Sequence, residues 1–178
     1  MSNDLKYSVL MSLYKNELPE HFRVAFESMV KQSVPPEQIV IVEDGPLPEE
    51  LISLIEGFSA DYPKVVTVVV NEKNIGLGLA LNKGFCRNEL VARMDTDDIS
   101  LPGRCERQLD EFAKNSDLAL VGSNVDEFIG SPDNIVSTRR VPSDYADIYE
   151  FAKRRSAFNH PAVMYKKSSV LSVGGYSD

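Results

Sequence analysis

The alternation of apolar runs with helix-periodic segments constrains the fold of this chain most strongly. Short runs rich in Val and Ile, which favour strands, occupy residues 7–14, 38–42, 65–70, 90–94 and 118–121. Apolar residues recur at helical spacing in the segments between them, at residues 19–31, 49–58 and 77–86. Pro102 stands where a further helix would begin. This β-α-β-α-β-α-β order predicts an α/β fold, with a mostly parallel central sheet flanked by helices on both sides.

The pattern loosens after Asn124. Residues 126–141 fit a hairpin or irregular strands, residues 145–154 a helix and residues 162–165 a strand. The chain has 178 residues, of which 43% are hydrophobic, and this is enough to build a core. No linker clearly divides it, so we expect a single domain over residues 1–178.

Composition bears on which partners and which cell compartment the chain is suited to. The formal net charge of −8 argues against binding to nucleic acid, which favours basic surfaces. Cys86 and Cys105 lack metal-type spacing and are expected to be reduced, structural thiols. No apolar run is long enough to span a bilayer, and the N-terminus lacks a signal-peptide pattern. We therefore expect a cytoplasmic protein.

Three aspartates crowd together after the fourth predicted strand, at Asp95, Asp97 and Asp98. Two carboxylates about 4 Å apart repel by roughly 4 kcal/mol at an effective dielectric near 20. Ligands of open α/β sheets bind outside the carboxyl ends of strands, where this cluster falls. Alternate residues of an extended chain point to the same side, so Asp95 and Asp97 can face one shared ligand. Their carboxylate oxygens suit Mg²⁺ or Mn²⁺. The alternative is a solvated acidic turn that caps the helix near Pro102.

Five motifs carry a resemblance to a known family. They are SVLMSLYKNE, VEDG, NIGLGLALNKG, ARMDTDDISLPGRCERQ and HPAVMYKKSSVLSVGGYSD, in this order. The chain resembles the family 2 inverting glycosyltransferases of bacterial exopolysaccharide and lipopolysaccharide synthesis. That family has the GT-A nucleotide-diphospho-sugar transferase fold. The resemblance covers nearly the whole chain.

The resemblance implies a donor site along the strand ends. Ser12, Tyr14 and Glu17 would border the nucleotide base, and Asp44 would hold the uracil or ribose side. Asp95 and Asp97 match the Asp-x-Asp pair that contacts the nucleotide sugar and a Mg²⁺ or Mn²⁺ ion. Of these two, Asp97 would be the direct ligand.

Further donor contacts are implied in the third helix and the fourth strand. Asn74, Gly76 and Asn82 would shape the pocket floor. Many relatives carry arginine where this chain has Leu81, and Lys83 could replace that phosphate contact. Arg93 could bind donor phosphate or pair with the acids. Arg104 has the same two alternatives, while the roles of Asp98 and His160 stay open.

The implied reaction moves a sugar from a nucleotide-diphosphate donor, with a UDP-sugar favoured, to a glycan or lipid-linked acceptor. Peripheral association with the inner face of the plasma membrane would follow from a lipid-linked acceptor. Residues 1–125 would form the nucleotide-sugar-binding half, and residues 126–178 the start of the acceptor-side half. No Glu-Asp pair follows Gly175, and Asp178 matches the turn rather than the family's general base. We therefore expect the N-terminal part of a longer chain or, alternatively, a nucleotide-sugar-binding module without transfer activity.

Other classes fit the motifs less well. GLGLALNKG resembles a dinucleotide fingerprint, but Leu81 replaces its third glycine, and it follows the third strand rather than the first. An Asp-x-Asp phosphatase would carry its motif after the first strand. A phospho-acceptor signalling domain would place a lone aspartate after the third strand, where Asn71 stands. Nucleotidyltransferases would have a glycine-rich first loop with a basic residue.

Overall fold

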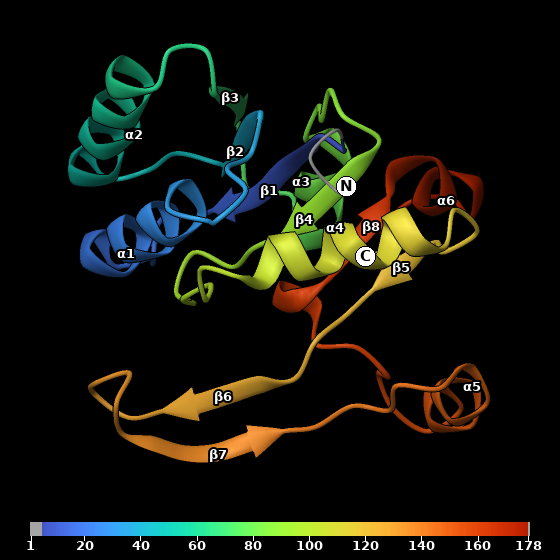
Figure 1. The fold of residues 1–178 in the computed structure, drawn as a ribbon. Coiled ribbons are helices and arrows are strands. Elements are labelled where there is room, and N and C mark those ends of the chain that lie inside the picture. The colour runs from blue at the N-terminus through green and yellow to red at the C-terminus, as the bar shows by residue number, and fades with distance from the viewer. Residues whose placement is uncertain (1–4, 178) are drawn as a thin grey trace.

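The computed structural model describes residues 5–177, and a six-stranded sheet with the order β3-β2-β1-β4-β8-β5 forms its centre (Figure 1). The strands are β1 (Tyr7–Leu13), β2 (Gln38–Asp44), β3 (Val66–Asn71), β4 (Leu90–Arg93), β5 (Leu120–Val121) and β8 (Met164–Lys166). The first four run parallel, and β8 lies antiparallel between β4 and β5. The predicted mostly parallel sheet is confirmed.

Helices cover both faces of the sheet. One layer consists of α1 (Pro19–Val30), α2 (Glu49–Asp61) and α4 (Arg104–Lys114); α3 (Leu77–Lys83) and α6 (Lys167–Ser172) lie on the other face (Figure 1). Strand β1 contacts both helix layers, because Val9 and Met11 pack toward α1 while Leu10 packs toward α3. None of the helices in the described part of the chain has the length and apolarity needed to cross a membrane.

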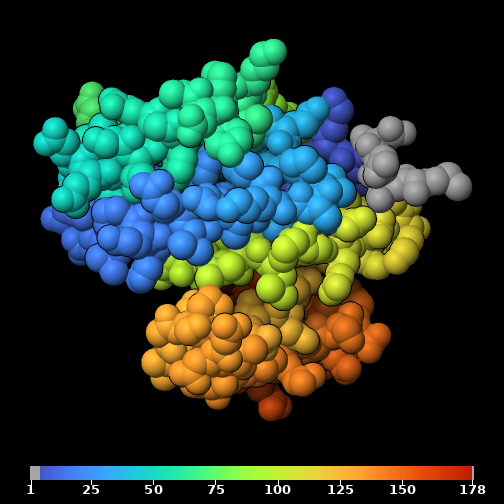
Figure 2. All heavy atoms as spheres, turned by 60° about the vertical axis from the view of Figure 1, so that its left-hand side comes forward, coloured from blue at the N-terminus to red at the C-terminus, as the bar shows by residue number. Residues whose placement is uncertain are grey.

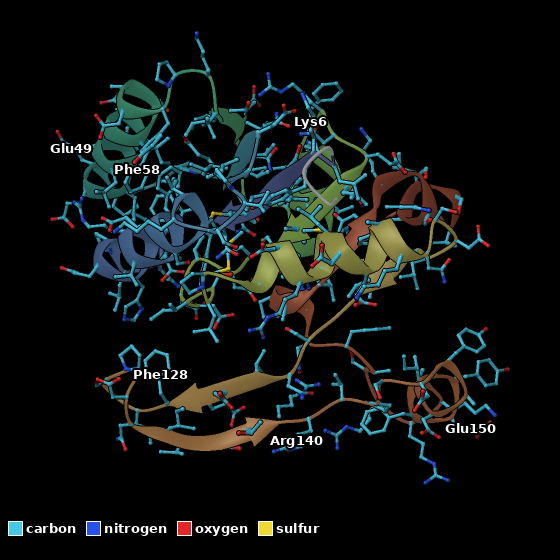
Figure 3. The ribbon with its side chains drawn as sticks, in the orientation of Figure 1. Lys6, Glu49, Phe58, Phe128, Arg140 and Glu150 are labelled. Atoms are coloured by element: carbon cyan, nitrogen blue, oxygen red, sulfur yellow. The ribbon has the colours of Figure 1, made fainter. Side chains whose placement is uncertain are left out.

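Aromatic packing joins α1 to α2. The rings of Phe26 and Phe58 stack with their centroids 3.9 Å apart, and Phe22 meets Phe58 edge-on at 5.5 Å. Phe58 lies between the two helices (Figure 3). All three side chains are buried, so this cluster is a principal source of the burial energy that fixes the first half of the domain.

The segment between β5 and β8 leaves the sheet. It contains the antiparallel hairpin of β6 (Val125–Phe128) and β7 (Ile135–Arg139), then α5 (Tyr145–Ala152) and the short 3-10 helix η1 (His160–Ala162). The hairpin forms a lobe that projects below the rest of the molecule (Figure 2). The predicted hairpin and helix are confirmed. Helix α5 buries none of its residues, so it contributes little to the core.

Three predicted boundaries were wrong. The helix predicted over residues 77–86 ends at Lys83, because Gly84 passes so close to β1 that a Cβ there would meet Leu10 Cδ1 at 2.2 Å. Helix α4 begins at Arg104, two residues after Pro102. Ala162 belongs to η1, so the last strand starts only at Met164.

The two cysteines are free and buried, as predicted for structural thiols. Burial raises the pKa of the Cys86 thiol to about 12, which keeps it protonated and unreactive near neutral pH. Asp178, weighed above as a general base, lies outside the described residues.

Candidate functional site

The loops after β1 and β4 are joined at the carboxyl edge of the sheet. The Thr96 hydroxyl donates to Glu17 Oε2 at 2.5 Å, and the other carboxylate oxygen of Glu17 accepts the backbone N–H of Leu18 at 2.9 Å. The Glu17 side chain is only 10% exposed. The structure therefore brings Glu17 to the Asp95–Asp97 turn, and it adds Thr96, which the sequence analysis did not single out.

Asp44 closes β2 and organises the loop that leads into α3. Its side chain is buried, and Oδ1 accepts the backbone N–H of Ile75 at 2.9 Å and the Asn71 amide at 3.2 Å. Oδ2 accepts the backbone N–H of Gly76 at 3.1 Å. The Asn74 amide donates to the Asp44 carbonyl at 3.2 Å. Asp44 thus holds the loop that contains Asn74 and Gly76, which are predicted to form the pocket floor. A contact between Asp44 and a nucleotide stays a prediction.

The acidic turn after β4 concentrates negative charge at this edge. The Asp95 side chain is 32% exposed, Asp97 is exposed and Asp98 is half-buried. Burial, and then the charges of Asp95 and Asp97, raise the pKa of Asp98 to about 6, while Arg93 and Arg104 oppose this rise. The helix-capping alternative is wrong, because the cap of α4 is Gly103, with no side-chain hydrogen bond.

The two arginines that flank the acids both make contacts within the protein. Arg93 is fully buried, and its guanidinium donates to the Met94 carbonyl and pairs with Asp95. Arg104 donates to the carbonyls of Arg93 at 2.8 Å and Val163 at 3.1 Å, which ties α4 to the β4–β8 pair. The pair with Asp95 is one of the two alternatives predicted for Arg93, and a contact between Arg93 and donor phosphate stays a prediction.

The remaining predicted residues separate into two groups. Ser12 is half-buried near the end of β1 and Tyr14, just beyond it, is 45% exposed, so both border the same edge as Asp44 and the acidic turn. Asn74 and Gly76 form the loop at this edge. Lys83 is exposed at the last turn of α3, about 10 Å along the helix axis from its start. The structure does not bring Lys83 to the strand ends.

Asn82 has a partner that sequence reasoning missed. Its amide donates to the Tyr176 carbonyl and accepts the Tyr176 N–H, both at 2.8 Å. Tyr176 in turn meets the His160 ring edge-on, with centroids 5.4 Å apart. Burial, followed by the charge of Arg93, lowers the pKa of His160. Only the motifs HPAVMY and VGGY pointed to this region.

The carboxylates of Asp95 and Asp97 do not form a complete metal cage. Within residues 5–177, no three His, Cys, Asp or Glu side chains gather in a way that could hold an ion. Hard carboxylate oxygens nevertheless suit a divalent cation that takes its other ligands from substrate phosphates and water. Burial is the main cause of the raised pKa of Asp98, and the charges of Asp95 and Asp97 add to it; a cation at this turn would offset only the repulsion between the carboxylates. The residues therefore fit an ion shared with a diphosphate.

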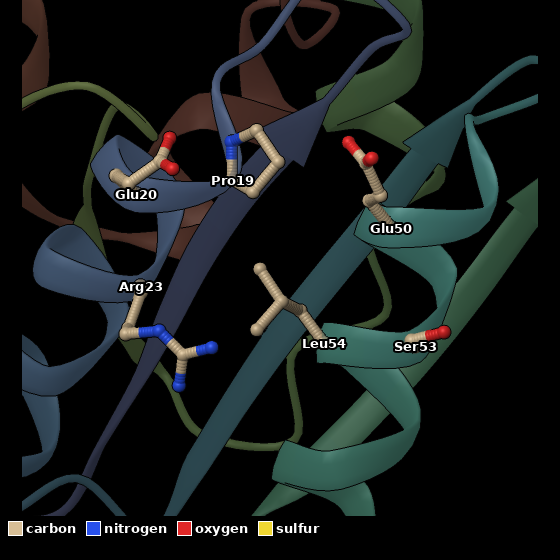
Figure 4. A pocket seen from close by; sticks show the side chains of 6 residues that line it. All are labelled: Pro19, Glu20, Arg23, Glu50, Ser53 and Leu54. Carbon is tan, nitrogen blue, oxygen red and sulfur yellow. The ribbon is translucent and has the colours of Figure 1, made fainter.

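A groove between α1 and α2 lies outside this site (Figure 4). It is lined by Pro19, Glu20, Arg23, Glu50, Ser53 and Leu54. Leu54 and Arg23 face it from opposite helices, and it includes none of the predicted donor-site residues (Figure 4). Its mixed charges suggest no particular ligand.

Solved structures confirm the predicted GT-A fold. A mannosyltransferase, PcManGT, from Pyrobaculum calidifontis, in complex with GDP-Man and Mn²⁺, superposes with a TM-score of 0.67 at 15% identity. The match covers 98% of this chain and 49% of that one. TarS from S. aureus gives 0.65 at 16% identity, covering 98% and 30% of the two chains.

The family follows from sequence. Residues 8–174 match the family described as Glycosyl transferase family 2, so the chain belongs to that family. It is 40% identical over 181 residues to a UDP-Gal:alpha-D-GlcNAc-diphosphoundecaprenol beta-1,3-galactosyltransferase of Escherichia coli, covering 100% of this chain and 65% of the relative. Over 172 residues it is 39% identical to the amylovoran biosynthesis glycosyltransferase AmsE of Erwinia amylovora, covering 96% and 63%. The chain thus spans slightly less than two thirds of the length of these two relatives.

Proposed function

We propose that this chain carries the donor site of a metal-dependent inverting glycosyltransferase. The enzyme transfers a sugar from a nucleotide-diphosphate donor, a UDP-sugar, to a glycan or lipid-linked acceptor in surface polysaccharide synthesis. The observation that carries the proposal is the Asp95-Thr96-Asp97 turn, bonded through Thr96 to Glu17 beside the end of β2. The names of the Escherichia coli and Erwinia amylovora relatives support the donor and the pathway class.

The donor lies along the carboxyl edge in this proposal. Ser12, Tyr14 and Glu17 border the nucleotide base, and Asp44 supports the uracil or ribose side while it holds the Asn74–Gly76 loop. Asp97, which is exposed, is the direct ligand of Mg²⁺ or Mn²⁺. Asp95 pairs with Arg93 through Oδ1 and is 32% exposed, so in this proposal its second oxygen is left to contact the ion or the donor.

The reaction is a single displacement. The acceptor oxygen bonds to the anomeric carbon from the face opposite the diphosphate, the carbon–oxygen bond to the diphosphate breaks, and the nucleoside diphosphate leaves with both electrons. The acceptor's proton passes to a general base. A bound divalent cation supplies positive charge that stabilises the departing diphosphate. Asp95 and Asp97 hold and orient that charge, and the Thr96–Glu17 bond keeps their turn against the base-binding loop.

Calorimetric titration tests the donor site. UDP is titrated with and without Mn²⁺ into the wild type, Asp97→Asn and the control Asp117→Asn, which removes an exposed carboxylate elsewhere. We expect Mn²⁺-dependent UDP binding in the wild type and the control and at least a tenfold loss in Asp97→Asn. If UDP, GDP and dTDP all fail to bind a correctly folded wild type, the proposed function is wrong.

A lipid-linked acceptor would bring the protein to the inner face of the plasma membrane. The support is the diphosphoundecaprenol acceptor named for the Escherichia coli relative. Cell fractionation tests this: the protein should divide between the cytoplasmic and membrane fractions and leave the membrane in high salt. Full retention in the cytoplasmic fraction at low salt would contradict it.

A further inference from the structure

Gln32 stands just after α1 and joins three separate segments of the chain. The residue is buried, and its Oε1 accepts the backbone N–H of Cys105 at 3.0 Å. Its Nε2 lies 3.0 Å from the carbonyl oxygens of Ser28 and Leu101 and 3.1 Å from Ser100 Oγ, so one of its two hydrogens is shared between two acceptors. Both ends of the amide are therefore partnered, and they hold the loop before α4 and the first turn of α4.

Two neighbouring serines strengthen this anchor. Ser28 Oγ accepts the backbone N–H of Ser100 at 3.1 Å. The backbone N–H of Ser33 donates to the Pro102 carbonyl at 2.8 Å. With the contact to the Leu101 carbonyl, the main chain is held at three consecutive residues of the loop that follows the acidic turn. This loop passes beside the end of α1 (Figure 1).

The acidic turn lies between this anchor and a second one. Thr96 donates to Glu17, just before α1, at 2.5 Å. Asp97 follows Thr96 directly and precedes Ser100 by three residues, so both anchors are close to it in the chain. Because Asp97 is exposed, its position is set mainly by the backbone on either side. The turn is therefore suspended between contacts at the two ends of α1.

We propose that Gln32 is a positioning residue for the metal ion of the donor site: by holding the main chain beyond the acidic turn, it keeps Asp95 and Asp97 at the spacing that a divalent cation requires. This inference rests on the proposed function. The aspartates of the turn repel one another, so a turn released at one end would open. Mg²⁺ requires near-ideal geometry with oxygen ligands at about 2.0–2.1 Å, so a carboxylate displaced by about 1 Å weakens the site. Gln32 acts through the backbone and touches neither the ion nor the donor.

Gln38 provides a matched control, because it is a second buried glutamine with similar bonds at the opposite edge of the sheet. Its Oε1 accepts the backbone N–H of Arg87 at 2.7 Å, and its Nε2 donates to the Phe85 carbonyl and the Thr67 hydroxyl, each at 3.1 Å. It begins β2, whereas the acidic turn follows the end of β4, and both strands run parallel to β1. At either position methionine keeps the length of the side chain and removes its amide.

Calorimetric titration of UDP at a series of Mn²⁺ concentrations tests the inference on the wild type, Gln32→Met and Gln38→Met. Urea denaturation without metal measures the stability of each protein, and we expect both variants to lose stability to a similar degree. In Gln32→Met the Mn²⁺ concentration for half-maximal UDP binding should rise about tenfold. In Gln38→Met it should stay within about twofold of the wild type, because the lost bonds lie far from the turn.

A milder pair of variants tests the same anchor. Ser28→Ala removes the acceptor of the Ser100 N–H, along with a bond from its hydroxyl to a carbonyl of α1. Ser59→Ala removes a similar bond to the Ile55 carbonyl within α2 and is the control. We expect Ser28→Ala to raise the Mn²⁺ requirement about threefold and Ser59→Ala to leave it unchanged.

The outcomes keep the two proposals apart. An unchanged Mn²⁺ requirement in Gln32→Met, or an equal rise in Gln38→Met, overturns the positioning role and leaves the donor site standing. UDP binding by the wild type that is independent of Mn²⁺ also overturns it, because the turn then holds no ion. Failure of UDP, GDP and dTDP to bind the wild type refutes the proposed function, and the inference with it. Should Gln32→Met not fold, the comparison of Ser28→Ala with Ser59→Ala decides in the same way.

Discussion

The carboxylate of Asp44 accepts the backbone N–H of Gly76 at 3.1 Å, which joins the end of β2 to the start of α3. The same carboxylate accepts the N–H of Ile75 at 2.9 Å, so one buried side chain satisfies two amides of the loop. The loop could not keep this shape without an acceptor there, because buried N–H groups without partners are costly. Asp44 therefore has a structural task that exists before any ligand binds.

Replacing Asp44 by asparagine tests that task. The amide of Asp44→Asn has one acceptor oxygen instead of two, so an N–H of the loop loses its partner. We expect a loss of about 1–3 kcal/mol in the free energy of unfolding. Urea denaturation measures it, with Asp61→Asn, at the exposed end of α2, as the control. Equal stability of the two variants would contradict the role of Asp44 in the loop.

Thr96 offers a test of the bond between the β1 and β4 loops. Thr96→Val keeps the shape of the side chain and removes the hydroxyl that donates to Glu17. The mostly buried Glu17 carboxylate then lacks that donor, so we expect about 1–2 kcal/mol of destabilisation and weaker UDP binding. Thr96→Ser retains the hydroxyl and should stay close to the wild type in both measurements. If the valine and serine variants lose UDP affinity equally, the hydroxyl is not responsible.

The central strands were predictable because their environment is simple. In β1 and β2 both faces are covered by helices, so each strand contains a continuous apolar run, residues 9–11 in β1 and 39–42 in β2. The acidic turn was predictable for a related reason. Polar residues directly after a buried run fall at the carboxyl edge, where ligands of such sheets bind.

The supporting contacts were not predictable because they join distant parts of the chain. Asn82 was expected to contact the donor, yet its partner Tyr176 lies 94 positions away and is reached only through the turn after α6. Arg93 was expected either to bind donor phosphate or to pair with the acids, but its complete burial was not foreseen. It is buried because β8 lies antiparallel against β4, and nothing in residues 90–94 indicates that neighbour. Local patterns report burial and secondary structure, but not which strand inserts beside another.

Arg93 provides a third prediction, through a double-mutant cycle with Asp95. Arg93→Met fills the buried volume but removes the partner of Asp95 and the donor to the Met94 carbonyl. We expect about 2–4 kcal/mol of destabilisation. Adding Asp95→Asn should restore part of that loss, because no unpaired carboxylate then remains. Thermal or urea unfolding of the four proteins gives the coupling energy, and strictly additive effects would contradict the pairing.

We expect substitution by alanine to have opposite effects on stability at Gly84 and Gly57. Gly84 has a φ of −63°, which alanine adopts freely, so a penalty for Gly84→Ala can only come from packing. A Cβ there would meet Leu10 Cδ1 at 2.2 Å and the Leu81 carbonyl at 3.2 Å, inside the contact between α3 and β1. We expect about 1–3 kcal/mol of destabilisation from this overpacking.

Gly57 is exposed in the middle of α2, where an added Cβ would meet nothing within 4 Å. Gly57→Ala should therefore stabilise the protein by about 0.5–1 kcal/mol, because alanine loses less backbone entropy in a helix. Urea denaturation of both variants checks the pair. The combination of Gly84→Ala with Leu10→Val, which removes the clashing Cδ1 methyl, should cost less than the sum of the two single changes. Additivity, or a stabilising Gly84→Ala, would mean that α3 does not approach β1 as closely as the structure has it.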